Sequence, residues 1–284
     1  MTWPSIPPVV ARAAPPLAPE PGWYTDPFVG DGLRWWDGWR WTAHAAPGPG
    51  RPSPPAPTLP VRAAVEMCAV ILALTVGLRF GLTAIARPLG PELAVLLSYT
   101  VLFGGMFLCA WYASRRYGTG AMRHDLGIEL RWIDLALGPA VAVGLYIGQV
   151  VLAAVLRAFN VPLGSNGQIV GGTTSRPWLF LVLVVAGVIG APIFEEIAFR
   201  GVIMRSLASR WPGWAAILGS SILFGLYHFT PELGAGNIGL IIILTAIGAG
   251  LAATAWLTRR LGAGMIAHAL MNGFVFALLW SLGH

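Results

Sequence analysis

The stretch PWLFLVLVVAGVIGAPIFEEIAFRGVIMRSLA, residues 177–208, decides the class of fold. Residues 177–194 carry no charged side chain, and a helical crossing of a bilayer requires about 20 predominantly apolar residues. Glu195, Glu196 and Arg200 then follow within the same apolar stretch. Each ionisable side chain near the bilayer centre costs about 2.5–3.5 kcal/mol on insertion scales. The stretch therefore predicts a membrane helix whose charged residues are retained for a function.

The chain beyond Arg62 repeats this apolar character. Of the 284 residues, 56% are hydrophobic and only 11% are charged, which is too apolar for a water-soluble globule. We predict an all-α polytopic membrane protein with about seven transmembrane helices in one membrane domain, residues 62–284. The predicted spans are residues 64–86, 91–113, 132–157, 177–208, 213–229, 237–257 and 262–281.

The first 61 residues have a different composition. Residues 22–47, GWYTDPFVGDGLRWWDGWRWTAHAAP, alternate aromatic residues with Gly-Asp turns and predict a small, Trp-rich, β-hairpin-like module. This module resembles a short domain of unknown function that is appended to actinobacterial membrane proteins. Residues 1–21 are predicted to be a disordered tail without a secretory signal, and residues 48–61 a semi-rigid, Pro-rich linker.

The arginines predict the orientation in the membrane. All 18 basic residues are arginine, and the loops after the second, fourth and sixth spans are rich in them. By the positive-inside rule these loops are cytoplasmic, which predicts a multi-pass protein of the cell (plasma) membrane with a cytoplasmic N-terminus. A nucleic-acid surface would gather arginines and aromatic residues into one stripe. The bilayer is therefore an expected partner and nucleic acid is not.

Three predicted spans contain polar residues spaced four apart. Residues four apart share one face of a helix, whereas Glu195 is rotated by about 100° from Glu196 and should have a different role. Glu195 and His228 lie at similar distances from the predicted turn at 211–213 and should be level. His268 should be nearer the cytoplasm than Glu195 and His228. All three would lie at the same depth if the fourth and fifth spans form a helical hairpin whose 200–213 end protrudes into the cytoplasm. The pairs are Glu196 with Arg200, Phe224 with His228, and His268 with Asn272.

The chain resembles the CAAX protease and bacteriocin-processing superfamily of intramembrane metalloproteases in three ordered motifs. They are Glu195-Glu196-x-x-x-Arg200, Phe224-x-x-x-His228 and His268-x-x-x-Asn272. The resemblance covers residues 130–281. It implies an endopeptidase that hydrolyses membrane-embedded or lipid-anchored peptides and proteins. Nothing in the sequence indicates that the substrate is prenylated.

Two chemistries fit these residues. In the first, Glu195 is the general base for a water, assisted by His228, while His268 and Asn272 donate hydrogen bonds to the oxyanion. In the second, Glu195, His228 and His268 hold a Zn²⁺ that activates the water. We favour the metal-free version and leave the cofactor open. Glu196 and Arg200 are expected to form a supporting ion pair, with Phe224 packing against the pocket.

Two other classes of function also fit a polar site in a membrane. A non-catalytic immunity or scaffold protein of the same fold would keep its function without Glu195. A proton-coupled transporter would use Glu195, His228 and His268 as a relay. We find no internal repeat of the kind that many transporters carry, which makes this reading weaker than the protease.

Overall fold

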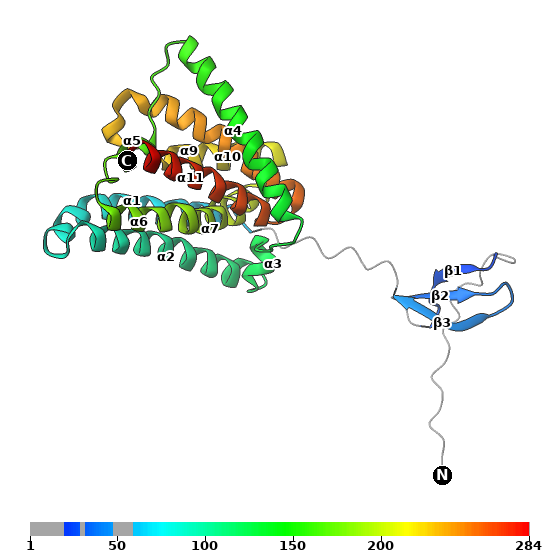
Figure 1. Cartoon of the computed structure of the whole chain (residues 1–284). Coiled ribbons are helices and arrows are strands. Elements are labelled where there is room, and N and C mark those ends of the chain that lie inside the picture. Colours follow the sequence, from blue (N-terminus) through cyan, green and yellow to red (C-terminus); the bar gives the residue numbers. More distant parts are fainter. Residues whose placement is uncertain (1–19, 29–31, 48–58, 284) are drawn as a thin grey trace. The chain divides into compact units, whose positions relative to one another are not determined.

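A computed structural model describes residues 20–28, 32–47 and 59–283 (Figure 1). It divides into two compact units, Met1–Ala56 and Pro57–His284. Most of the predicted tail, residues 1–21, and most of the predicted linker, residues 48–61, lie outside the described residues.

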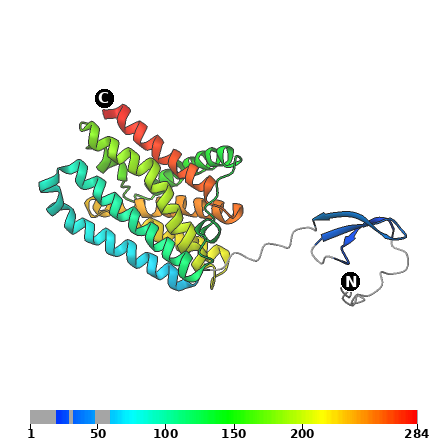
Figure 2. The same cartoon turned by 90° about the horizontal axis from the view of Figure 1, so that it is seen from below.

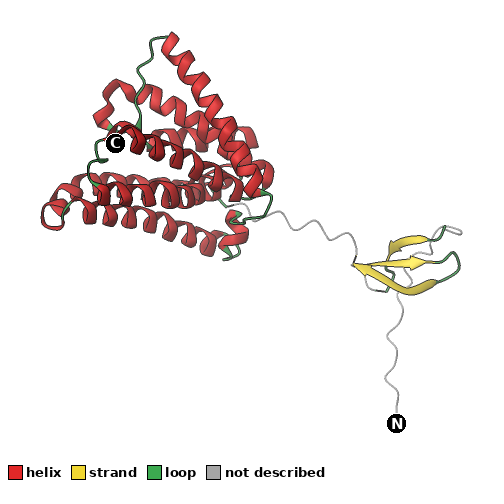
Figure 3. Ribbon diagram, in the orientation of Figure 1, coloured by secondary structure: helices red, strands yellow, loops and turns green. Residues whose placement is uncertain are grey.

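The N-terminal unit contains a three-stranded antiparallel sheet in the order β1 (Gly22–Thr25), β2 (Gly32–Trp36) and β3 (Trp41–Pro47) (Figure 3). The predicted hairpin-like module is thus confirmed, with one strand more than a hairpin. Among its described residues, the unit buries the Asp26 carboxylate, which accepts hydrogen bonds from the Arg34 side chain and from Phe28 N.

The larger unit is helical throughout its described secondary structure. It begins with α1 (Val61–Leu89), α2 (Pro91–Tyr117), α3 (Met122–Leu126), α4 (Asp134–Ala158) and α5 (Asn166–Gly171). The fourth apolar segment runs through α6 (Pro177–Val185), η1 (Ala186–Gly190), α7 (Ala191–Glu195), η2 (Glu196–Met204) and α8 (Arg205–Leu207). The chain continues with α9 (Gly213–Tyr227), η3 (Pro231–Gly236), α10 (Asn237–Thr258) and α11 (Gly262–Gly283).

Six segments of the described chain are long and apolar enough to cross a membrane, as predicted for six of the seven spans. The remaining one, α9, has 15 residues and ends at Tyr227, short of the predicted residue 229. It ends there because the next turn is built differently. Asn237 bonds to Thr230 N through Oδ1 and to Thr230 O through Nδ2, and this satisfies backbone groups that a helix would have paired.

The fourth segment is the centre of the unit. α1, α2, the fourth segment and α11 lie side by side in that order (Figure 2), and η2 also contacts α9 and α10. All nine residues of η2 are buried. η1 and η2 are π-helical, a conformation that is rare and frequently found at functional sites. Glu195 lies between these two π-helical segments.

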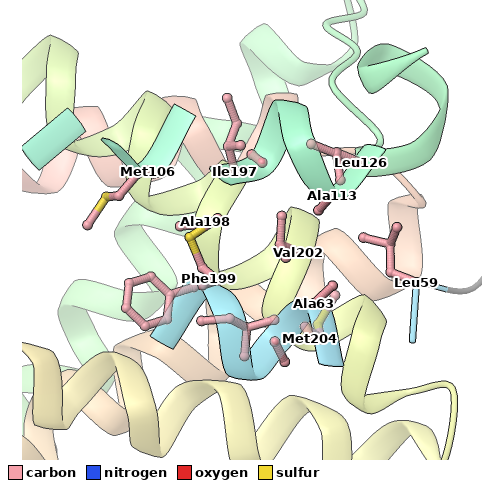
Figure 4. Packing of buried hydrophobic residues seen from close by; sticks show 14 of the residues in the cluster. Leu59, Ala63, Met106, Ala113, Leu126, Ile197, Ala198, Phe199, Val202 and Met204 are labelled. Carbon is pink, nitrogen blue, oxygen red and sulfur yellow. The ribbon is translucent and has the colours of Figure 1, made fainter. Parts of the chain in front are cut away.

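The main hydrophobic core surrounds η2 (Figure 4). Phe199, Val202 and Met204 pack with Leu59 and Ala63 in and just before α1, and residues of α2, α3, α9 and α10 join the cluster. The outer surfaces of the helices instead expose large apolar side chains, among them Leu72, Phe80, Val143, Ile147 and Trp178. A buried centre with an apolar exterior is what a lipid-facing helical bundle requires.

The Arg-rich loops meet at one end of the unit. The Arg205 side chain bonds to Arg259 O, and Leu261 N and Gly262 N bond to Gly127 O and Glu129 O. Beside them, Arg260 forms a bidentate pair with the buried Asp134 carboxylate, at 2.8–3.1 Å. This network fixes the first turn of α11, which leads to His268.

Candidate active site

Glu195, His228 and His268 come together in the interior of the helical unit. They lie at the end of α7, directly after α9, and in α11. Glu195 Oε2 is 4.0 Å from His228 Nε2 and 3.9 Å from His268 Nε2. Glu195 is 5% exposed, and its Oε2 atom has no hydrogen-bond partner among the described residues. Both histidine Nε2 atoms thus lie within 4.0 Å of the same carboxylate oxygen.

The second nitrogen of each imidazole is occupied. His228 Nδ1 lies 2.8 Å from Phe224 O, and His268 Nδ1 lies 3.1 Å from Glu196 Oε1. Because a carbonyl and a carboxylate only accept hydrogen bonds, Nδ1 carries the proton in both rings. When the rings are neutral, Nε2 is an acceptor that faces Glu195. Three acceptors turned toward one another require a hydrogen-bond donor between them.

Glu196 and Arg200 form the expected ion pair, with Arg200 Nη1 3.0 Å from Glu196 Oε1. Both side chains are fully buried. Arg200 Nη2 also donates to Gly248 O, and its guanidinium lies over the Phe224 ring, 4.4 Å from the centroid. The Phe224 ring contacts the His228 ring as well, at 4.7 Å between centroids. Glu196 therefore links the buried cation to His268, and Phe224 packs between the cation and His228.

Asn272 has a structural contact that its sequence position does not reveal. Its Nδ2 donates to Gly187 O at 2.7 Å, one turn along α11 from His268. The Gly187 carbonyl lacks the usual backbone partners, because Ala191 N donates to Ala186 O and Pro192 has no N–H. At least one Asn272 amide hydrogen is thus used to hold α11 against η1 rather than to face substrate.

The distances at the site are longer than those between the ligand atoms of a tetrahedral zinc site. Zinc binds nitrogen and oxygen at about 2.0–2.2 Å, so ligand atoms of a tetrahedral site lie about 3.4 Å apart. Here the corresponding separations from Glu195 Oε2 are 3.9 and 4.0 Å. Among the described residues, no group of three or more His, Cys, Asp or Glu has the geometry to hold a metal ion.

An open cavity of ≈ 550 Å³ is lined by residues of η1, α7 and α11 and by α3 with the chain that follows it. Its walls are mainly apolar, with Arg123 and Glu129 at the end where the Arg-rich loops meet. Pro192, which lines it, is three residues before Glu195 in the chain. The apolar lining comes from Ile128, Leu130, Val188, Ile189, Pro192, Ile193, Gly262, Met265, Ile266 and Ala269.

The structure joins six of the seven motif residues through direct contacts, whereas Asn272 contacts Gly187 O instead. Sequence reasoning did not find the backbone partners, Gly187 O and Gly248 O, because a carbonyl carries no residue-type signal. It also missed Tyr227, whose ring contacts both His228 and Phe199. Tyr227 could have been identified from the sequence as an aromatic residue that directly precedes a motif histidine.

Comparison with known proteins supports a membrane protease. Residues 177–274 match the family described as type II CAAX prenyl endopeptidase Rce1-like, and this range contains all seven motif residues. "Putative membrane peptidase YdiL" of Bacillus subtilis (strain 168) is 33% identical over 95 residues, which are 34% of this chain and 36% of that protein. Residues 21–56 match a family of proteins of unknown function, DUF2510. No solved structure matches the chain.

These matches confirm the resemblance to CAAX proteases over the fourth segment and the helices that follow it. The family match leaves the first three spans outside, whereas the predicted resemblance, residues 130–281, had included the third. The chain spans about a third of the length of the curated relative it matches. The activity and substrates of the whole protein are therefore matters for the proposal that follows.

Proposed function

We propose that the chain is an intramembrane endopeptidase that hydrolyses peptide bonds of membrane-associated peptides or proteins with a water activated by Glu195. The observation that carries the proposal is the convergence of Glu195 Oε2 with His228 Nε2 and His268 Nε2 within 4.0 Å. These groups are buried among apolar side chains, where retaining three polar residues without a function would be costly.

In the proposed reaction, the water donates one hydrogen bond to Glu195 and the other to His228 Nε2. Glu195 takes a proton as the water oxygen bonds to the scissile carbonyl carbon, and the carbonyl π electrons move to its oxygen. The protonated Glu195 then gives that proton to the amide nitrogen as the C–N bond breaks. A carboxylic acid and an amine are released, and Glu195 returns to the carboxylate.

His268 is the proposed donor to the oxyanion. With neutral imidazoles, Glu195, Glu196 and Arg200 leave the buried cluster with one net negative charge. A proton on His268 Nε2 neutralises the cluster, while the Nδ1 hydrogen bond to Glu196 holds the ring. The N–H at Nε2 can then donate to the oxyanion, an interaction worth about 2.7–4 kcal/mol in other hydrolases. Asn272 supports this arrangement by fixing α11 through Gly187.

The proposed substrates are membrane-embedded or lipid-anchored. The apolar cavity beside Pro192 is suited to an apolar segment, with Arg123 and Glu129 at its charged end. The clustering of the Arg-rich loops at this end supports a cytoplasmic orientation for it in the cell membrane, with the N-terminus on the same side. The proposed specificity does not require a prenyl group.

The test is cleavage of a membrane-peptide library by the purified full-length chain, with Glu195→Gln as the comparison and a zinc chelator in parallel. We expect cleavage by the wild type, none by Glu195→Gln, and no effect of the chelator. Equal cleavage by the variant would refute the role of Glu195. Cleavage that the chelator abolishes and added zinc restores would refute the metal-free mechanism while leaving the protease assignment intact.

A further inference from the structure

The N-terminal sheet has one face formed by Tyr24, Trp36 and Trp41, here called the aromatic face. Trp36 and Trp41 are cross-strand partners, and Gly22 pairs with Trp36, so Tyr24 two residues on points to the same side. The Trp41 ring contacts the other two edge-to-face, at 5.2 Å from Trp36 and 6.2 Å from Tyr24 between centroids. Tyr24 is 37% exposed.

The chain that enters the sheet is already tied to this face. Tyr24 Oη donates a 2.8 Å hydrogen bond to Glu20 O. The residues before β1 emerge at the end of the sheet where Trp36 and Trp41 lie, because Gly22 is opposite Trp36. Glu20 is the first described residue, and a proline-rich stretch, PPLAPEP at residues 15–21, runs into it.

The spacing of these prolines matches a polyproline II helix. That helix has three residues per turn and no internal hydrogen bonds, so its carbonyls remain free to accept. Pro16 and Pro19 would share one edge of it, and Pro15 and Pro21 another. Aromatic-lined grooves bind such helices by packing on the proline rings and donating to the carbonyls, at little cost in conformational entropy.

We propose that the aromatic face is a binding site for proline-rich segments in the polyproline II conformation, and that residues 15–21 of this chain are its occupant. The Tyr24–Glu20 bond is one contact of the kind such a site makes. This function belongs to the N-terminal unit and is independent of the proposed protease activity.

The experiment uses the chain that starts at Gly22, which lacks the segment ahead of it, and a fluorescent peptide of residues 14–21, APPLAPEP, which carries the Glu20 carbonyl. Fluorescence anisotropy should show saturable binding with a Kd tighter than about 1 mM. The full-length chain should bind the peptide at least threefold more weakly, because its own segment competes. A peptide with alanine in place of its four prolines should not bind.

Two aromatic substitutions make the matched comparison. Trp41→Ala should weaken binding at least tenfold, whereas Trp39→Ala should leave it within twofold, because Trp39 lies in the β2–β3 turn and is 91% exposed. Tyr24→Phe keeps the ring and removes only the hydroxyl, so it should weaken binding by about two- to tenfold even if Trp41→Ala disturbs the sheet.

Three results would overturn the proposal. One is the absence of binding to the chain that starts at Gly22. Another is equal binding by the wild-type aromatic face and by the Trp41→Ala and Tyr24→Phe variants. The third, equal binding by the full-length and shortened chains, would show that residues 15–21 do not occupy the face.

Discussion

The Asn272 side-chain amide lies 2.7 Å from Gly187 O, a carbonyl for which the helix itself provides no donor. At the π-helical spacing seen for Ala191 N and Ala186 O, the donor to Gly187 O would be residue 192, which is proline. The active-site helix α11 is thus joined to the helix bearing Glu195 at a position where proline has removed a backbone hydrogen bond.

Removing this amide should impair the protein, and a second substitution should repair it. Asn272→Ala leaves Gly187 O unpaired, at a cost of about 1–3 kcal/mol. Pro192→Ala supplies an N–H at the π-helical spacing, so the double variant should regain both thermal stability and kcat. The measurements are melting in detergent and peptide cleavage. Pro139→Ala, which changes a proline inside α4, is the control and should not rescue.

An essential oxyanion role for Asn272 predicts a different result. In that case Pro192→Ala could restore stability but not kcat, because the lost hydrogen-bond donor would still be missing from the transition state. A double variant with recovered melting temperature and unrecovered kcat would therefore contradict the positioning role.

The adjacent glutamates should respond in opposite ways to amide substitution. Glu195→Gln removes a charge whose Oε2 has no described partner, so we expect cleavage to be lost while the melting temperature stays the same or rises. Glu196→Gln leaves the buried Arg200 without its counter-charge, so the melting temperature should fall. Similar melting temperatures for the two variants would contradict the division of roles.

Arg200 should not tolerate lysine. A lysine keeps the charge but cannot reach Glu196 and Gly248 O with a planar fork, nor stack on Phe224 in the same way. We expect Arg200→Lys to lose stability and, through the freed Glu196–His268 contact, to lower kcat more than it raises KM. Arg157→Lys, at the end of α4, is the matched control and should behave as the wild type.

The sequence predicts the helices of this fold far better than their internal geometry. Apolar stretches of about 20 residues identified six membrane spans, because a bilayer imposes a length on every crossing. The length of α9 was overestimated, since Asn237 pairs with the backbone at Thr230 from a later part of the chain. Nor did the apolar pattern at 177–208 show the π-helical segments, which depend on where backbone hydrogen bonds form.

The same distinction holds for the site. Spacing of four placed Glu196 beside Arg200 because a helix fixes that geometry locally. The contact of His268 with Glu196 and of Asn272 with Gly187 depends on how α11 packs against the fourth segment. Such contacts between distant parts of the chain follow from tertiary packing, so no spacing of residues in the sequence predicts them.

The pair of Asp134 and Arg260 should support the site from a distance. Asp134→Asn replaces the acceptor of a buried bidentate pair and should cost about 1.5–3 kcal/mol. Glu129→Gln changes a nearby half-buried carboxylate paired with Arg131 and should leave the melting temperature unchanged. We also expect Asp134→Asn to lower kcat, because the network fixes the first turn of α11. Unchanged kcat at a temperature well below unfolding would contradict that link.

Asp125 should make the helical unit sensitive to acid. Burial alone would raise the pKa of this carboxyl, but hydrogen bonds from Ser114 and Thr119 outweigh it and hold the pKa below its ordinary value of 3.8. A folded-state pKa below the unfolded one stabilises the fold above the unfolded pKa, and this stabilisation is lost as the pH falls through the folded value. The melting temperature should therefore fall more steeply below about pH 4 in the wild type than in Asp125→Asn. If the melting temperatures of the two proteins fall equally steeply below about pH 4, Asp125 is not the group responsible.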